Sequence, residues 1–211
     1  MNSDRGAVFW EYIAGMSAAW GALSTGIVLG WTSLARKSIE NGAYGFSVSP
    51  HQFGWISSAL NIGAAFSCIP IGHYMNLIGR RLTMLILVAP FTVGWLLLIW
   101  PRNIFMLYIG RFVLGICCGG LCVAAPIYIA EIASDRIRGT LCSFFQLFIT
   151  IGILVAYLLC WKIEIMTANA ISACFPLLFG FTFYYMPETP AYLVIMHIFV
   201  NVFFEHKARH K

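Results

Sequence analysis

The chain has 211 residues, of which 60% are hydrophobic and only 10% are charged, and its formal net charge is +5. Because a soluble domain is about 25% charged, most of this chain is expected to lie in lipid. The basic residues are scattered rather than gathered into a block, which argues against a nucleic-acid partner.

Six segments are apolar and long enough to cross about 30 Å of hydrocarbon. They cover residues 12–34, 53–75, 82–100, 104–130, 140–161 and 168–186. The sequence therefore predicts an all-α membrane protein, with one six-helix bundle over residues 12–190 that follows a short N-terminal segment, 1–11. Only residues 101–103 separate the third span from the fourth, so these two spans are expected to be adjacent and antiparallel, whereas residues 35–52 form the longest connection.

The distribution of Lys and Arg favours an N-terminus in the cytoplasm. In that orientation eight basic residues lie inside and four lie in outer loops, while Arg111 falls within the fourth span. Without the last 21 residues the bias shrinks to five against four. We therefore expect an integral, multi-pass protein of the plasma membrane, with residues 1–11 in the cytoplasm.

Small residues recur at helical spacing within two of the spans. Gly26 and Gly30 form one G-x-x-x-G pair, and Gly115 and Gly119 form another. Such pairs allow helix backbones to approach closely in lipid, although glycine is also common in membrane helices generally. The seven cysteines all lie in apolar segments, which predicts reduced, buried thiols rather than disulfides or a metal site.

The composition changes after the sixth span. Residues 187–190 read Pro-Glu-Thr-Pro, which is expected to end the helix. The tail that follows, residues 191–211, is first apolar and then basic. It is interpreted as an interfacial amphipathic helix, or alternatively as a disordered or non-native segment.

Three motifs carry a family resemblance. From Val113 the chain reads V-x-G-I-x-x-G-G, then seven residues, then Tyr128-x-x-Glu131, then six residues and Arg138. In these positions it resembles the sugar porters of the major facilitator superfamily. Residues 72–81 resemble the superfamily motif G-x-x-x-D-R-x-G-R-R, with Asn76 and Leu77 as departures, and residues 187–193 resemble P-E-S-P-R-Y-L without its arginine. Residues 30–33 are similar to the branch of facilitative trehalose and glucose transporters.

The resemblance covers residues 10–193 and implies the N-terminal half of a twelve-helix carrier, built from two inverted three-helix repeats. It implies transport of a hexose or trehalose by alternating access. It also implies a conformational network of charges, which would comprise Arg80, Arg81, Arg111, Glu131, Arg138 and Glu188. The alternatives are solvated, topology-setting charges at the membrane surface and, for Arg111, a side chain that snorkels to the interface.

A sugar site needs hydrogen-bonding groups near the middle of the membrane. Gln146 offers two donors and an acceptor, which suit a vicinal diol. Gln146, Ile149 and Ile153 share one helical face, and the family places a sugar-binding glutamine and aliphatic residues there. Thr25 in the first span is a weaker candidate. Alternatively, Gln146 bonds to a neighbouring helix.

The first span, residues 12–34, contains no Asp or Glu. Because a coupled proton needs a titratable group near the site, passive uniport is favoured over symport. Three hypotheses remain: a half-carrier that pairs with another half or with itself, a truncated membrane protein that does not transport and at most modulates its full-length relatives, and a fragment of a proton-coupled solute symporter. No hydrolase, zinc-protease or nucleotide-binding motif occurs, so neither an enzyme nor a cofactor is expected.

Overall fold

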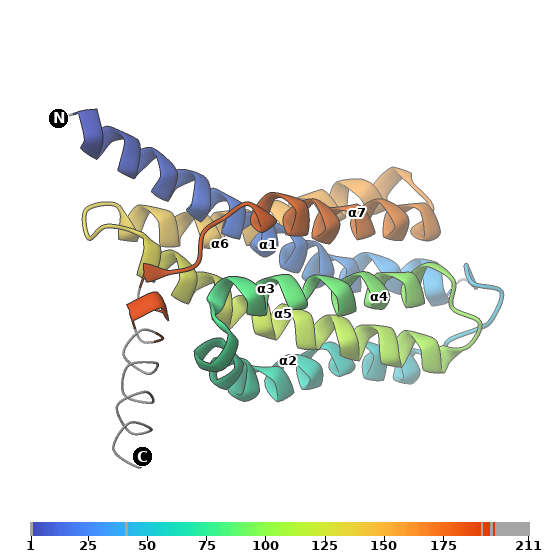
Figure 1. Ribbon diagram of the computed structural model, residues 1–211. Coiled ribbons are helices and arrows are strands. Elements are labelled where there is room, and N and C mark those ends of the chain that lie inside the picture. The colour runs from blue at the N-terminus through green and yellow to red at the C-terminus, as the bar shows by residue number, and fades with distance from the viewer. Residues whose placement is uncertain (1, 41, 191, 195, 197–211) are drawn as a thin grey trace, which may run out of the picture.

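The computed structural model describes residues 2–40, 42–190, 192–194 and 196, and all the regular elements among them are helices (Figure 1). Within these residues, six stretches are long and apolar enough to cross a membrane, as predicted. The third of these stretches consists of two consecutive helices, α3 and α4. The helices are α1 (Asn2–Glu40), α2 (Pro50–Ile78), α3 (Arg80–Ile86), α4 (Val88–Ile99), α5 (Ile104–Ile132), α6 (Arg138–Lys162) and α7 (Ile165–Tyr184).

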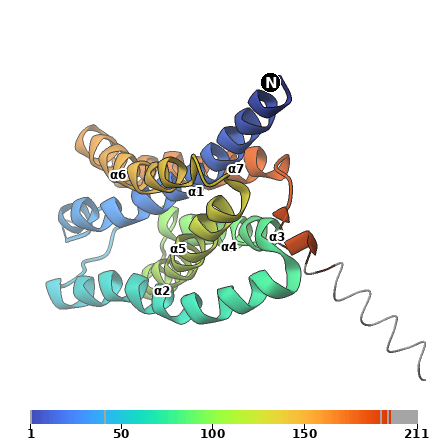
Figure 2. The same cartoon turned by 90° about the vertical axis from the view of Figure 1, so that its left-hand side faces the viewer.

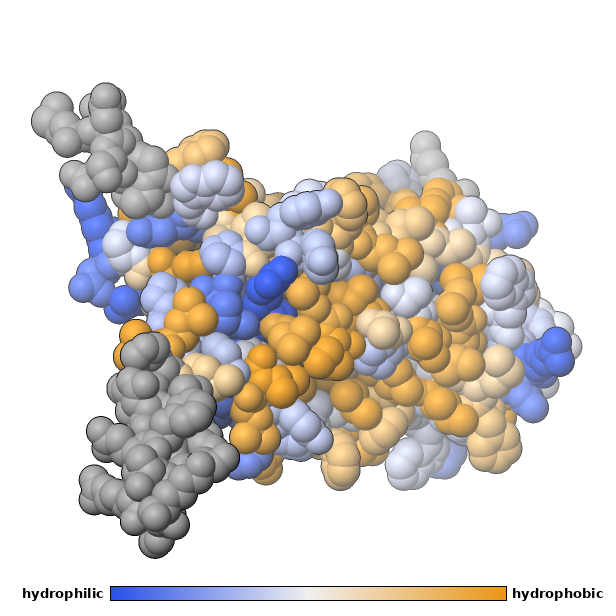
Figure 3. All heavy atoms as spheres, in the orientation of Figure 1, coloured by the Kyte–Doolittle hydropathy of each residue, from blue (hydrophilic) through white to orange (hydrophobic). Residues whose placement is uncertain are grey.

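Hydrophobic side chains cover the middle of the face drawn in Figure 3, and hydrophilic ones gather toward its two ends. This distribution is typical of a bundle whose middle is solvated by hydrocarbon. The prediction of an all-α membrane bundle is therefore confirmed. The predicted tail, residues 191–211, lies largely outside the described residues.

Helix α1 is longer than the span predicted from hydropathy. It has 39 residues and therefore measures about 58 Å, nearly twice the thickness of the hydrocarbon. Its last turns remain helical because Ala35 and Ile39 are buried against the bundle. The connection to α2 is accordingly residues 41–49 instead of the predicted 35–52.

The helices form two layers, which Figure 2 shows nearly end-on. Helices α6, α1, α5 and α2 lie side by side in that order, and we call them the front layer. Helix α7 packs against α1 and α4, and α4 packs against α5, so the back of the front layer is covered. Helices α6 and α2 are the two edges of the front layer.

Two glycine crossings hold the front layer together. A Cβ placed on Gly26 of α1 would lie 2.1 Å from the carbonyl oxygen of Ile149 in α6, and one placed on Gly115 of α5 would lie 2.1 Å from that of Leu60 in α2. The close packing predicted for the two glycine pairs is therefore confirmed. The two crossings use equivalent residues, because Gly115 lies 89 positions after Gly26 and Ile149 lies 89 positions after Leu60. This constant shift indicates that the three spans of α1–α4 and the three of α5–α7 are repeats of one unit. Because α1 and α5 run in opposite directions, the repeats are inverted.

Candidate functional site

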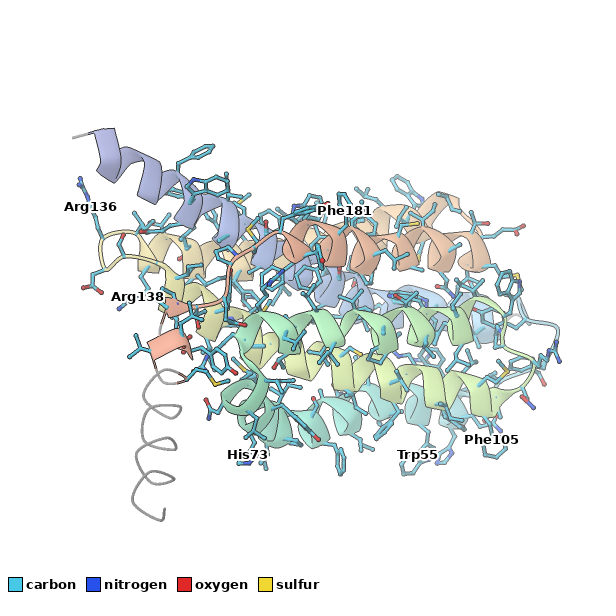
Figure 4. The ribbon with its side chains drawn as sticks, in the orientation of Figure 1. Trp55, His73, Phe105, Arg136, Arg138 and Phe181 are labelled. Atoms are coloured by element: carbon cyan, nitrogen blue, oxygen red, sulfur yellow. The ribbon has the colours of Figure 1, made fainter. Side chains whose placement is uncertain are left out.

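The two ends of the bundle differ in their charges. Figure 4 shows Arg136, in the connection before α6, and Arg138, the first residue of α6, at the opposite end of the bundle from Trp55 and Phe105. We call these the Glu131 end and the Phe105 end. Four of the six predicted network charges meet at the Glu131 end.

Arg80 begins α3 and is paired with Glu131, near the end of α5. Its Nη2 lies 2.8 Å from Glu131 Oε1 and its Nε donates to the same oxygen at 3.1 Å. The Arg80 Nη1 donates to the carbonyl of Met75 in α2 at 3.3 Å. Arg80 thereby ties α2, α3 and α5 together with one planar, multi-donor group.

Glu188 follows α7 and accepts hydrogen bonds from backbone amides. Its Oε1 accepts from Arg80 N at 3.1 Å, Arg81 N at 3.0 Å and Thr189 N at 3.1 Å. The turn that presents these amides requires a glycine, because Gly79 has φ +95° and a Cβ there would lie 2.5 Å from Glu188 Oε2. The structure thus brings Arg80, Arg81, Glu131 and Glu188 together, and we call these four residues the arginine clasp.

Two tyrosines that were not among the predicted site residues brace the clasp. The hydroxyl of Tyr128 in α5 donates to the carbonyl of Pro187 at 2.9 Å, and that of Tyr192 donates to the carbonyl of Leu77 at 3.1 Å. The Tyr192 ring also lies 5.8 Å from the Arg80 guanidinium carbon. Both tyrosines lie within the motifs quoted above, and this position could have marked them as site residues from the sequence.

Arg138 does not join the clasp, contrary to the prediction. Its guanidinium pairs with exposed Asp135 at 2.8 Å and donates to the carbonyls of Ala130 and Ala133 at 3.0 and 3.4 Å. The physical reason is local, since the last carbonyls of α5 have no helical partner and a cation satisfies them.

Arg111 also lies apart from the clasp, which corrects its assignment to the same network. It is twenty residues before Glu131 on α5, or about 30 Å along the helix. Its side chain is fully buried rather than snorkelling, donates to the carbonyl of Val28 at 3.1 Å and to the hydroxyl of Thr32, and lies 4.8 Å from the ring of Trp31. Arg111 therefore joins α5 to α1 near the Phe105 end.

A buried amide extends this connection to α7. Asn169 Oδ1 accepts a hydrogen bond from Trp31 Nε1 at 2.6 Å, and its Nδ2 donates to Tyr44 Oη and to the carbonyl of Leu98, both at 2.9 Å. The amide is fully buried and joins α1, α4, α7 and the connection after α1. Asn169 was not predicted, although an amide within an apolar span is a recognisable signal.

The predicted sugar-site residues occupy three different environments. Gln146 is exposed, and no side-chain hydrogen-bond partner for it occurs among the described residues. Ile149 is buried against α1, and Ile153 is half-buried beside it. Thr25 is buried and donates to the carbonyl of Gly21 in its own helix at 3.2 Å, so in this arrangement it does not line an open path.

Polar exposed side chains continue on both sides of Gln146 along α6. Ser143 and Thr150 are exposed as well, and the three lie on one side of the helix at spacings of three and four residues. In α2, Asn61 is exposed and stands at the position equivalent to Thr150 by the shift of 89. The two edges of the front layer therefore carry exposed polar groups at equivalent places.

The cysteines are free, but they are not all buried as predicted. Cys117 and Cys118 are buried, whereas Cys68, Cys122 and Cys174 are exposed. Because α1, α2 and α4 surround α5 on its other sides, the exposed side of α5 at Cys122 belongs to the open front of the layer.

Comparison with known proteins identifies the family. The model of the family described as "Sugar (and other) transporter" matches residues 10–198. The chain belongs to this family. The match spans all six membrane helices, and the motif-based resemblance is thereby confirmed.

The relatives are named as sugar transporters, which agrees with the prediction that the chain is not an enzyme. The mouse protein "Solute carrier family 2, facilitated glucose transporter member 8" is 34% identical over 187 residues, which are 88% of this chain and 39% of the relative. "Facilitated trehalose transporter Tret1" of Drosophila virilis is 29% identical over 188 residues, 89% of this chain and 21% of the relative. The chain thus spans less than two fifths of the length of these curated relatives.

Solved structures agree on the fold. The inward-open conformation of the xylose transporter XylE from E. coli superposes with a TM-score of 0.78 at 24% identity, over 87% of this chain and 50% of XylE. The architecture is therefore that of one six-helix bundle of a major facilitator superfamily fold.

Proposed function

We propose that this six-helix unit forms one wall of a facilitative sugar carrier that works by alternating access. The observation that carries the proposal is exposed Gln146 in a membrane helix, which lies between exposed Ser143 and Thr150. The hydroxyls of Ser143 and Thr150 donate to carbonyls of their own helix, so Gln146 is the polar side chain of this row that needs an external partner. Polar groups are costly in hydrocarbon and normally face water or protein partners. A path for a polyol supplies both, because hydroxyl groups of the sugar exchange hydrogen bonds with the amide of Gln146.

The substrate class follows from the same chemistry and from the relatives. Two related proteins are named as transporters of glucose and of trehalose. These names favour a hexose or trehalose as the substrate of the present chain. Ile149 and Ile153 lie at the edge of the contact between α6 and α1 and hold Gln146 in position. Thr25 donates a hydrogen bond within α1 and is not assigned to the sugar path. The protein is expected to serve in the plasma membrane with its N-terminus in the cytoplasm.

A carrier also requires a second wall. Helices α2 and α6 expose polar side chains at the two edges of the front layer, and a second six-helix unit facing this layer covers both edges at once. The related mouse protein is more than twice as long as this chain, which is long enough to contain a second unit of this size. The unit comes from a longer form of the chain, from a related protein or from a second copy.

The surroundings of Arg111 support uniport. Among the described residues its guanidinium contacts a carbonyl, a hydroxyl and an aromatic ring, and no carboxylate. A proton-coupled site needs an acid that binds and releases a proton near the path. We therefore infer that sugar moves down its own gradient without a proton.

The arginine clasp serves the conformational change. It joins the ends of α2, α5 and α7 with one ion pair and a set of backbone hydrogen bonds, so these ends move as a single body. The unit then rocks against its counterpart, and contacts at the Glu131 end close the cytoplasmic side. Arg138 contributes by holding the end of α5.

Uptake into proteoliposomes tests the proposal. Purified chain is reconstituted alone and together with the separately expressed C-terminal half of a related carrier, and uptake of radiolabelled glucose and trehalose is measured with and without a pH gradient. We expect saturable uptake that the pH gradient leaves unchanged and that Gln146→Ala reduces at least tenfold. The matched control is Leu147→Ala, on the neighbouring exposed position, which should leave uptake intact.

Three results would contradict the proposal. Uptake that stays at the level of empty liposomes in both reconstitutions argues against a carrier. Uptake driven by the pH gradient argues for symport. Equal uptake by the Gln146→Ala and Leu147→Ala variants removes Gln146 from the site.

A further inference from the structure

A pocket of about 360 Å³ opens beside the arginine clasp, on the lipid-facing side of α3. Its lining residues come from the end of α2, the start of α3, the end of α7 and the segment after α7. Figure 1 shows the ends of these helices at the Glu131 end. The pocket combines apolar walls with one cation and one carboxylate. Its lining residues are Ile78, Arg81, Leu82, Leu85, Tyr184 and Glu188.

Arg81 is held in place in this pocket by two contacts with Tyr184. Its Nη2 donates to the carbonyl of Tyr184, and its guanidinium carbon lies 5.7 Å from the Tyr184 ring. The Nε is buried and has no hydrogen-bond partner. Among the described residues, no carboxylate forms an ion pair with the Arg81 guanidinium. Two contacts thus fix the plane of a guanidinium that still has free donors.

The carboxylate of Glu188 is already engaged. Its Oε1 accepts three backbone amides, including those of Arg80 and Arg81 themselves. The other acid of the clasp, Glu131, is paired with Arg80. Among the described residues the Arg81 guanidinium therefore forms no salt bridge, although the negative charge of Glu188 in the same pocket opposes any anion that binds.

Exposed tyrosines place the pocket at the level of lipid headgroups. Tyr74, Tyr184 and Tyr185 are exposed by 55%, 62% and 68% at this end of the bundle. Amphipathic aromatic rings concentrate at the boundary between hydrocarbon and water. Leu82, exposed by 48%, continues from this level along the lipid-facing side of α3. A ligand here has its polar group at the interface and its apolar part in the hydrocarbon.

We propose that this pocket, which we call the Arg81 pocket, binds an anionic phospholipid, with the phosphate on Arg81 and an acyl chain along Leu82 and Leu85. A guanidinium matches the paired oxygens of a phosphate, and basic pockets between membrane helices are suited to such headgroups. The phosphate of the lipid accepts hydrogen bonds from guanidinium donors of Arg81 that have no acceptor among the described residues. This inference does not depend on whether sugar is transported.

Lipid retention measures the proposed binding directly. Purified chain in dodecyl maltoside is mixed with phosphatidylglycerol or phosphatidylcholine of identical acyl chains, and bound lipids are counted by native mass spectrometry. The unsubstituted chain should retain phosphatidylglycerol in preference. Arg81→Gln should weaken its apparent affinity about tenfold or more, the range expected for a charged hydrogen bond. The control Arg102→Gln removes one exposed cation at the Phe105 end and should change nothing.

A second variant tests the apolar part and leaves the guanidinium untouched. Leu82→Trp fills the pocket and should abolish the preference for phosphatidylglycerol, whereas Leu96→Trp, at a similarly exposed leucine of α4 outside the pocket, should preserve it. If Arg81→Gln fails to fold, this second pair of variants decides. Equal retention of the two lipids by the unsubstituted chain, or an unchanged preference in Leu82→Trp, would overturn the proposal.

Discussion

The guanidinium of Arg80 and the carboxylate of Glu131 are joined at 2.8 Å, and their side chains are only 9% and 19% exposed. One group belongs to the first repeat and the other to the second. The pair therefore crosses the boundary between the two repeats at the place where α5 leaves the membrane.

Removing the cation from this pair should destabilise the fold strongly. Arg80→Ala leaves Glu131 without its partner in a site largely withdrawn from solvent, and broken buried pairs cost about 3 kcal/mol or more. Arg138→Ala breaks an exposed pair, which contributes about 1 kcal/mol or less. Unfolding of both variants in detergent micelles, followed by tryptophan fluorescence, gives the comparison. Equal losses would show that the clasp has no special role.

The front layer should be sensitive to a single methyl group at Gly26. Gly26→Ala places a Cβ against the backbone of Ile149, and such overpacking costs about 1–3 kcal/mol. Gly54→Ala in α2 meets nothing within 4 Å and should stabilise its helix by about 1 kcal/mol. The two variants are therefore expected to shift the midpoint of thermal unfolding in opposite directions. A shift in the same direction would contradict the close crossing.

Tyr44 should make the fold sensitive to alkaline pH. Burial raises the pKa of Tyr44 above its ordinary value near 10, although its hydrogen bond with Asn169 acts the other way. A raised pKa contributes stability that is present below pH 10 and is lost as the pH rises above it, because only the unfolded chain then ionises freely. Unfolding measured between pH 8 and 11 should show this loss, and Tyr44→Phe should flatten it. An identical pH dependence in the two proteins would show that Tyr44 is not the group responsible.

Thiol labelling should distinguish the front layer from the lipid-facing back. Cys122 and Cys174 are both exposed, but Cys122 lies on the open front and Cys174 on α7 of the back layer. Since the thiolate is the reactive form and requires water, a membrane-impermeant maleimide should label Cys122 and spare both Cys174 and buried Cys117. Single-cysteine variants in proteoliposomes allow each site to be scored separately. Labelling of Cys174 with no reaction at Cys122 would place the aqueous path elsewhere.

The sequence was sufficient for the six spans because hydropathy acts over some twenty residues at a time. It also identified Gly26 and Gly115 as points of close approach, since only a missing side chain allows backbones to touch. The partner helices were beyond reach, because spacing within α1 does not reveal that Ile149 of α6 lies opposite.

Individual charges were harder to place than helices. Arg80 and Glu131 form the ion pair that the motif implied. Arg138 instead donates to nearby carbonyls, and Arg111 donates to groups on α1. For each guanidinium, hydrogen bonds to nearby groups compete with an ion pair to a distant carboxylate. The spacing of residues in a motif does not show which of these partners lies within reach. The burial of Thr25 and the exposure of some cysteines also differ from the predictions, because the neighbouring helices decide which side of a helix is covered.

The length of α1 has a mechanical consequence. Its 39 residues form one rod that Glu11 fastens to Ser134 at one membrane surface, with hydrogen bonds of 2.9 Å, and that Trp31 fastens to Asn169 near the other. Because Glu11 and Trp31 are twenty residues apart, or about 30 Å along the helix, a tilt of α1 imposed at one membrane surface also displaces its attachment at the other.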